Sequence, residues 1–557
     1  SPLALSAASE EALTALAQKH AEQLLKLSDT PSNWIDYSFS NNNSRSRHSH
    51  RLVVTANSCT SASEALESLV VGDSLDKVAR GSAPFTAPKI AFMFAGQGSQ
   101  YAGMLKALYQ TEPVIQDILN YCNNIARESL GYELLDVIFD AQENEPSNLD
   151  KTINTQPALF ACEVALAMLW RSKGVQPDMV LGHSIGEFAA AHIAGVLSLD
   201  DALKLVLSRG QLMQALPSGR MISISDSEAA IENHFSALSP EDNNAVSIAA
   251  LNGQHNVVVS GQSSSIEKLV NILDEHNIQY LELDVSHAFH SPMMAPMIDD
   301  FEKVLDTVTF NPPHTPLISN ITGAYSGDDI SSKKYWLEHT LAPVKFHESI
   351  GYAAQQGATV FVEIGAKSTL TNLGKVSLPE SQYHWLTSAS PRGNGQQFFL
   401  DNLGTAFCLG ADIAWSEFSG TTRVRDLSIP SYPFQRKRFW PDIDPLNMAG
   451  SVHPLLGSKT PLAGKSGALY TKKLNETEHQ YLTGHVINKL VIFPGAGYLE
   501  IALSAATQEW KGKAVSCRNV MFHQPLILGE LSDCTLQTQV LFEGDSEAGI
   551  EIYSNHS

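Results

Sequence analysis

The sequence lacks several features that would assign it to a specialised class of protein. No stretch approaches the ~18 consecutive apolar residues of a membrane-spanning helix. The six cysteines include no C-x-x-C pair, so we expect free thiols in a reducing compartment and no metal site. The first residues contain neither an initiator Met nor a charged region before an apolar one, so we expect no secretory signal here and a piece of a longer chain. We therefore predict a cytoplasmic protein.

Positive charge is also scarce. Lys and Arg together number 37 against 59 Asp and Glu, a formal net charge of −22. Binding to nucleic acid or to an anionic membrane needs a basic surface that neutralises phosphates. The sequence therefore predicts neither as a partner. Its 557 residues, 43% of them hydrophobic, suffice for three or four globular domains of about 150 residues each.

The first 80 residues predict a small α/β unit. Residues 9–27 carry Leu and Ala at helical spacing, and residues 63–71 predict another short helix. Residues 31–50 are rich in Asn, Ser and Arg, which predicts a loop. The segment RLVVTA at 51–56 is typical of a strand. Residues 81–88 (GSAPFTAP) are a plausible boundary.

A larger α/β domain is expected next. Lys89–Phe94 (KIAFMF) predicts a buried strand, and Asp178–Leu181 predicts a second. Residues 219–286 predict strand, helix, strand, strand, helix and strand in that order, which indicates a ferredoxin-like subdomain inserted into the larger domain. Residues 382–446 show little periodicity, and a strand-rich segment begins at His453.

A candidate nucleophile stands on a sharp turn. Gly182-His183-Ser184-Ile185-Gly186 fits G-x-S-x-G, with a predicted strand before it and a predicted helix at 187–195. This context exposes the serine hydroxyl and places helix N-terminal amides beside a developing oxyanion. A serine nucleophile needs a base. Of the 19 histidines, those in His287-Ala288-Phe289-His290 are favoured because this segment directly follows a predicted strand.

With these motifs, the sequence resembles the acyltransferase domain of type I polyketide synthases and the malonyl-CoA:acyl-carrier-protein transacylase family. Four motifs occur in the family's order: Gly96-Gln97-Gly98-Ser99-Gln100, Gly182–Glu187, Arg209-Gly210-Gln211-Leu212-Met213-Gln214 and His287–His290. The predicted ferredoxin-like insertion lies between the last two, as in the family. The resemblance implies a hydrolase-like α/β acyltransferase core.

The resemblance also implies a ping-pong acyl transfer. Ser184 would attack the thioester of malonyl-CoA, and His290 would take its proton. The phosphopantetheine thiol of an acyl carrier protein would then accept the acyl group. The family implies an oxyanion hole formed by the backbone N–H groups of Gln97 and Ile185. We expect no acidic third member, no metal and no cofactor bound by the chain itself.

The expected acyl pocket favours a carboxylate. By the resemblance, Arg209 grips the free carboxylate of malonyl through two parallel hydrogen bonds. Gln156 and His287 are expected to line the same pocket. Phe289 is bulky and would fill the space that an α-methyl branch needs, so we predict malonyl-CoA over methylmalonyl-CoA. Discrimination against one methyl group is worth only about 1–3 kcal/mol.

Flanking segments resemble other parts of the same synthases. Residues 1–87 resemble the linker domain between a ketosynthase and its acyltransferase, and residues 88–380 the acyltransferase domain. Residues 381–446, which end in the stretch YPFQRKRFW, resemble the post-acyltransferase linker. Residues 447–557 resemble the N-terminal hotdog, an α+β fold, of a polyketide synthase dehydratase. A neighbouring ketosynthase domain is therefore an expected partner, together with the acyl carrier protein.

The dehydratase resemblance contains departures from the family. His485 and Pro494 match the signature H-x-x-x-G-x-x-x-x-P, but Lys489 replaces its Gly, and Gly484 stands where an Asp commonly precedes the His. The family's catalytic Asp belongs to the second hotdog, so the candidate His485 has no acid partner within this sequence. We favour a truncated dehydratase over a degenerate one kept as a scaffold.

Two other functions compete with acyl transfer. A serine hydrolase or editing esterase also uses G-x-S-x-G, but it usually needs an Asp or Glu between the Ser and a late His, and an apolar pocket. Arg209 favours a carboxylate substrate instead. A non-catalytic docking or scaffold fragment is the second alternative, indicated by the two linkers and the partial dehydratase.

Overall fold

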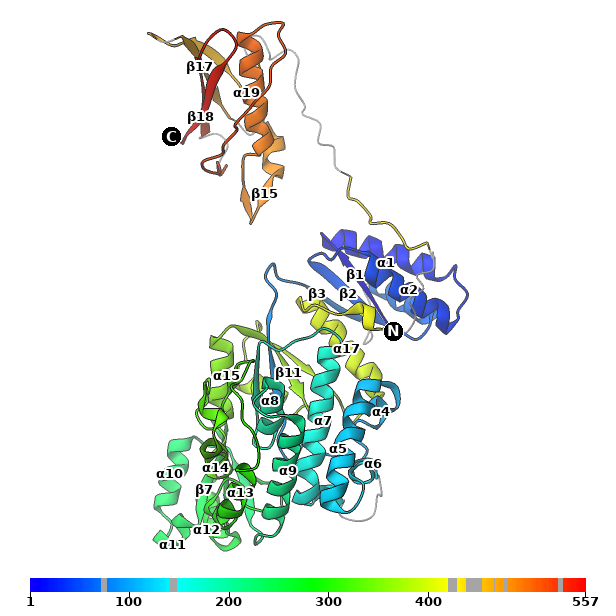
Figure 1. The fold of residues 1–557 in the computed structure, drawn as a ribbon, viewed down its shortest axis with the longest axis vertical. Helices are drawn as coiled ribbons and strands as arrows, with labels where there is room; N and C mark the ends of the chain where they lie inside the picture. Colours follow the sequence, from blue (N-terminus) through cyan, green and yellow to red (C-terminus); the bar gives the residue numbers. More distant parts are fainter. Residues whose placement is uncertain are drawn as a thin grey trace. The chain divides into compact units, whose positions relative to one another are not determined.

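The computed structural model describes residues 1–71, 78–140, 148–418, 428–436, 453–464, 466–474, 479–528 and 534–556. The chain divides into two compact units, Ser1–Phe434 and Gln435–Ser557 (Figure 1). Among the described residues, every helix is too short or too polar to span a bilayer.

The first unit begins with a small α/β domain that has its own hydrophobic core. Its three strands form an antiparallel sheet in the order β1-β2-β3. The strands are β1 (Pro2–Ala7), β2 (His50–Thr55) and β3 (Val78–Ser82), and the helices are α1 (Glu10–Leu24), α2 (Pro31–Ser44) and α3 (Cys59–Val71). Strand β1 was not predicted from the sequence.

Helix α2 corrects the prediction of a loop over residues 31–50. The Thr30 side chain accepts a hydrogen bond from Asn33 N–H, and Pro31 occupies the first turn, where its missing N–H is not needed. Trp34 and Tyr37 from the same helix are buried in the core of the small domain. The polar composition therefore concealed a helix with a packed face.

The asparagines of α2 cover the edge of the sheet. Asn42 Oδ1 accepts the N–H of Ala4 at 2.9 Å, and its Nδ2 donates to Pro2 O at 2.9 Å. Asn41 Nδ2 donates to Ala4 O at 2.7 Å. Because β1 is an edge strand, these amides satisfy backbone groups that no neighbouring strand pairs.

The larger domain is built on a five-stranded parallel sheet in the order β10-β5-β4-β11-β12. Its strands are β4 (Lys89–Phe94), β5 (Met179–Gly182), β10 (Leu317–Ile318), β11 (Ala358–Ile364) and β12 (His384–Thr387). Its helices are α4 (Lys106–Thr111), α5 (Pro113–Leu130), α6 (Leu134–Phe139), α7 (Thr152–Ser172), α8 (Gly186–Ala194), α9 (Leu199–Gln214), α13 (Ile298–Leu305), α14 (Lys333–Leu341), α15 (Phe346–Gln355), α16 (Thr369–Ser377) and α17 (Gly395–Leu409). The predicted strands over 89–94 and 178–181 are both present.

The inserted subdomain has the predicted ferredoxin-like fold. Four antiparallel strands lie in the order β7-β8-β6-β9, with their own apolar core. The strands are β6 (Arg220–Ile224), β7 (Val246–Gly253), β8 (Asn256–Gly261) and β9 (Tyr280–Glu282), and the helices are α10 (Glu228–Ser236), α11 (Pro240–Asn244) and α12 (Ser263–Glu275). Figure 1 shows these elements together at one end of the larger domain.

Two elements correct the expectation of little regular structure over residues 382–446. Strand β12 completes the parallel sheet, and α17 contacts β2 and β3 of the small domain (Figure 1). Both lie beyond the boundary predicted at residue 380. Phe399, Leu403 and Phe407 of α17 are buried, and no residue of the helix is fully exposed, so the contrast between a buried face and a solvent face is weak.

After α17 the chain returns to the small domain. The Tyr432 hydroxyl accepts the N–H of Ala8 at 2.9 Å, and Arg45 Nη2 donates to the carbonyls of Ile429 and Pro430 at 3.1 Å each. The last residues of the predicted post-acyltransferase linker, 437–446, lie outside the described residues.

The second unit contains an antiparallel sheet in the order β13-β14-β17-β18 and helix α19 (Gly495–Glu509), which contacts β17. The strands are β13 (Ser458–Pro461), β14 (Gly467–Lys473), β17 (Cys534–Phe542) and β18 (Ala548–His556), and a short hairpin joins β15 (Val486–Ile487) to β16 (Leu490–Val491). A sheet packed on one long helix agrees with the predicted partial hotdog.

Candidate active site

Ser184 lies on the sharp turn between β5 and α8. Its φ angle is 52°, in the left-handed region. A Cβ on Gly182 would collide with the backbone of Glu187, and one on Gly186 with the carbonyl of Phe94. Only glycine fits at either position, so the G-x-S-x-G spacing is a requirement of this turn.

The hydroxyl of Ser184 meets the imidazole of His290. Ser184 Oγ lies 2.7 Å from His290 Nε2, and His290 Nδ1 lies 2.8 Å from the carbonyl oxygen of Ala342. The carbonyl can only accept, so Nδ1 carries the proton and Nε2 is free to accept one. Burial, with a contribution from Arg209, lowers the pKa of His290 to about 3. The ring is therefore neutral at physiological pH.

Arg209 of α9 is a buried cation with unused hydrogen-bond donors. Its side chain is 1% exposed, and Nη1 donates to Gln156 Oε1 at 2.8 Å. Nε and Nη2 have no partner within the described part of the chain. Burial lowers the pKa of Arg209 to about 9. A buried guanidinium without a counter-ion is unfavourable on its own, so the arrangement suits an anionic ligand.

The other predicted pocket residues are also buried. His287 Nδ1 lies 2.7 Å from Ser286 Oγ, and its Nε2 lies 3.2 Å from the carbonyl oxygen of Leu216, which follows α9. The ring of Phe289 lies 6.1 Å from that of His287 and is 6% exposed. The structure thus pairs Gln156 with Arg209, and His287 with Phe289.

Two backbone amides in loops at the ends of adjacent strands remain open. The N–H groups of Gln97 and Ile185, in the loops after the adjacent strands β4 and β5, make no hydrogen bond among the described residues. Ser99 Oγ donates to Gly96 O at 2.8 Å and tightens the first of these loops. Ligands of parallel α/β sheets bind at this carboxyl end of the strands.

Sequence reasoning missed a buried polar group behind the nucleophile. Ser184 N–H donates to Asn320 Oδ1 at 3.0 Å, and Asn320 N–H donates to Glu187 Oε2 at 2.8 Å. Glu187 also accepts from the Tyr335 hydroxyl, and His339 Nε2 lies 3.7 Å from it. Burial raises the pKa of Glu187 to about 8. An acid inside the apolar stretch EFAAAHIAG was an available signal for Glu187, whereas no pattern marks Asn320.

In the second unit, His485 Nδ1 lies 2.7 Å from Ile492 O, across the β15–β16 hairpin. No carboxylate among the described residues pairs with His485. Asn488 and Lys489 form the two-residue loop with φ angles of 50° and 65°. Loops of this kind prefer glycine, which explains why the dehydratase signature has Gly where this chain has Lys489.

A serine–histidine pair at the carboxyl end of a parallel sheet, with an inserted ferredoxin-like subdomain, defines an α/β acyltransferase. Residues 91–413 match the model of the acyl transferase domain, residues 453–555 that of the polyketide synthase dehydratase domain, and residues 1–66 the CurL-like, polyketide synthase C-terminal family. The chain belongs to the acyl transferase domain family, and its three matches identify a segment of a type I polyketide synthase, as the motifs predicted.

Known proteins support this assignment. The chain is 34% identical to polyketide synthase GfsA of Streptomyces halstedii over 100% of its own length and 8% of that protein's. It is 36% identical to mycoketide-CoA synthase of Mycobacterium tuberculosis over 92% of its length and 12% of that protein's. The chain therefore spans only a small part of the relatives that it matches.

Solved structures agree with the fold. The acyltransferase domain from the second module of the salinomycin polyketide synthase is 38% identical, with a TM-score of 0.65 over 77% of this chain and 98% of that one. The acyl transferase domain of ZmaA is 26% identical, with a TM-score of 0.69 over 76% of this chain and 97% of that one.

Proposed function

We propose that this acyltransferase loads malonyl from malonyl-CoA onto the phosphopantetheine thiol of an acyl carrier protein. The observation that carries the proposal is the buried guanidinium of Arg209, with Nε and Nη2 unpartnered, in the same domain as a Ser184–His290 pair at 2.7 Å. A carboxylate fits two parallel N–H donors of a guanidinium. Malonyl provides that carboxylate at one end and a reactive thioester at the other.

In the first half-reaction, Ser184 Oγ attacks the thioester carbon while His290 Nε2 takes the hydroxyl proton. The Ala342 carbonyl holds the opposite N–H of the imidazolium, and the amides of Gln97 and Ile185 stabilise the oxyanion. The carbon–sulfur bond then breaks, and the CoA sulfur leaves with the proton from His290. The product is a malonyl ester on Ser184.

In the second half-reaction, the carrier thiol gives its proton to His290 and attacks that ester. The ester bond to Ser184 breaks, and the serine oxygen recovers the proton. Burial is the larger cause of the lowered pKa of His290, and the charge of Arg209 lowers it further. The malonyl carboxylate offsets the charge of Arg209, so the bound substrate makes His290 a stronger base than in the free protein.

Preference for malonyl over methylmalonyl rests on Phe289, which is buried beside the base and would meet an α-methyl group. The related acyl transferase domain of SpnD, 27% identical, was solved in complex with 2-(pent-4-yn-1-yl)malonyl. A substituted malonyl on this relative supports a malonyl-type acyl group here.

A lipase-like hydrolase is not favoured, because a buried Arg209 is incompatible with a purely apolar pocket.

Partners follow from the proposed reaction and from the neighbouring segments. The acceptor is an acyl carrier protein, and a ketosynthase is the expected neighbour of the small N-terminal domain. The contacts of Tyr432 and Arg45 return the end of the first unit to that domain.

The test is to incubate the protein with radiolabelled malonyl-CoA and to follow acid-stable label on Ser184. Wild type should be labelled and should pass the label to a carrier protein, while Ser184→Ala should not be labelled. Arg209→Ala should lose malonyl loading and gain acetyl loading. An unlabelled wild type would refute the proposed substrate, and faster loading of methylmalonyl would refute the preference.

A further inference from the structure

Both members of the catalytic pair have an unusual backbone. The φ angles are 52° at Ser184 and 56° at His290. Residues other than glycine adopt this left-handed conformation at a cost, and they keep it only where the surrounding structure holds them. The groups that hold these two backbones therefore determine whether hydroxyl and imidazole meet.

Asn320 holds the backbone of Ser184. Its Oδ1 accepts the Ser184 N–H at 3.0 Å, and the orientation of the amide is determined because a backbone N–H must meet an oxygen. The backbone of Asn320 is held in turn, since its N–H donates to Glu187 at 2.8 Å and its carbonyl accepts from Lys345 N–H at 2.8 Å. Asn320 is 2% exposed.

The backbone of His290 is held by the ferredoxin-like subdomain. Ser247 Oγ, on β7, donates to the carbonyl of His290 at 2.9 Å. Ser260 Oγ, on the adjacent strand β8, donates to the carbonyl of Phe289 at 2.7 Å. The base is therefore attached to the inserted sheet, whereas the nucleophile is attached to the parallel sheet.

We propose that Asn320 and Ser247 are positioning residues. Asn320, which follows β10 of the parallel sheet, holds Ser184 in its left-handed conformation, and Ser247, on β7 of the inserted sheet, holds His290 in its own. This inference deepens the proposed function and rests on the acyl-transfer mechanism. Neither residue touches the substrate in that mechanism. Each acts through the backbone of a reacting residue.

The test measures the nucleophile without the substrate. A fluorophosphonate reacts when Ser184 Oγ bonds to phosphorus, fluoride leaves and His290 takes the proton, so its labelling rate reports on the pair alone. Asn320→Leu and Ser247→Ala should each slow labelling about 10- to 100-fold, the size expected for a displacement of about 1 Å. With malonyl-CoA, kcat should fall similarly and KM should stay unchanged, because Arg209 is untouched.

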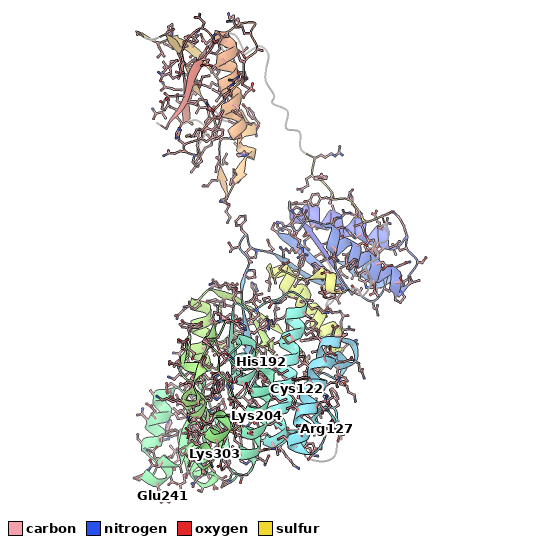
Figure 2. All side chains as sticks on the ribbon, in the orientation of Figure 1. Cys122, Arg127, His192, Lys204, Glu241 and Lys303 are labelled. Carbon is pink, nitrogen blue, oxygen red and sulfur yellow. The ribbon has the colours of Figure 1, made fainter. Side chains whose placement is uncertain are left out.

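Two matched variants control for general damage. Asn123 of α5 also accepts a backbone N–H, that of Leu135 at 3.0 Å, and Ser223 of β6 donates to Asn256 at 3.2 Å. Figure 2 shows Cys122, the neighbour of Asn123, well separated from Glu241 of the ferredoxin-like subdomain, which also contains Ser223. The two controls therefore probe different parts of the first unit. Asn123→Leu and Ser223→Ala should lower the melting temperature comparably but label at the wild-type rate.

Conservative variants complete the test. Ser247→Thr keeps the hydroxyl and should label near the wild-type rate, and Asn320→Asp keeps the acceptor oxygen and should label faster than Asn320→Leu. If Asn320→Leu does not fold, Asn320→Ser replaces it, since its shorter side chain cannot reach the amide. Labelling of Asn320→Leu or Ser247→Ala at the rate of their controls would overturn the inference. A wild type that reacts with the probe but not with malonyl-CoA would refute only the proposed substrate.

Discussion

At the scale of single residues, buried side chains without partners occur both at the proposed site and away from it. Arg209 has two free donors beside a base, and Glu163 of α7 has two carboxylate oxygens without a partner among the described residues. The contexts differ. Both residues are 1% exposed, but Arg209 acts electrostatically on the base His290, whereas burial together with Glu363 raises the pKa of Glu163 well above the usual range.

Glu163 should make stability depend on pH. Its pKa is higher in the folded chain than in the unfolded one, so its contribution to stability is complete below the unfolded value and is lost as pH rises through the folded value. Glu163→Gln removes the ionisation and keeps the shape. We expect a higher free energy of unfolding than wild type, with a gain that grows from pH 5 to pH 8, measured by urea denaturation. The exposed Glu64→Gln is the control, and an equal gain at both pH values would contradict the prediction.

At the residue scale, the G-x-S-x-G spacing predicts Ser184, the position after a predicted strand favours His290, and the family resemblance implies Arg209. Asn320 could not be predicted. It reaches Ser184 from a position 136 residues further along the chain, and its role depends on one oxygen that meets one amide. Sequence patterns report periodicity and local turns, not a single long-range hydrogen bond.

At the scale of elements, the errors occurred where polar residues are buried or where a helix is covered on several sides. The polar composition of residues 31–50 predicts a loop, yet Asn41 and Asn42 of α2 satisfy the edge strand β1. Helix α17 has no exposed polar stripe. The ferredoxin-like insertion was predicted correctly, because its strands and helices follow each other in a pattern that local periodicity reveals.

The hydrogen bonds of Asn42 to β1 should be measurable. Asn42→Leu leaves the N–H of Ala4 and the carbonyl of Pro2 without these partners, so we expect a loss of about 1–3 kcal/mol in the free energy of unfolding. Asn43, next in the helix, is exposed and donates only to Phe39 O within its own helix. Asn43→Leu should therefore change stability by less than about 0.5 kcal/mol. Equal losses in chemical denaturation would contradict the role assigned to Asn42.

At the scale of the whole molecule, all residues assigned to acyl transfer belong to the first of the two compact units. The small domain, α17 and the segment around Tyr432 form part of the same unit. The second unit contains the dehydratase candidate His485 but no acid paired with it among the described residues.

Separating the two units should separate the activities. The chain 1–434 should load malonyl onto Ser184 within about two-fold of the rate of the full chain, because every residue assigned to the site belongs to the first unit. The full chain should not dehydrate a 3-hydroxyacyl carrier protein. Radiolabel incorporation and a mass-spectrometric assay of the carrier measure the two outcomes. A ten-fold loss of loading on removal of residues 435–557 would contradict this division.

The sequence alone predicted the family, the turn that exposes Ser184, the candidate base and, through the family resemblance, the proposed cation Arg209, because each belongs to a short motif. The tertiary structure decided what surrounds them. It brought His290 onto Ser184 across 106 residues, left Arg209 without a counter-ion and placed Asn320 and Ser247 on the two strained backbones. The pKa of His290 and the hydrogen-bond partner of each donor depend on burial and on distances between segments that are remote in the sequence. Burial and these distances are defined only once the chain has folded.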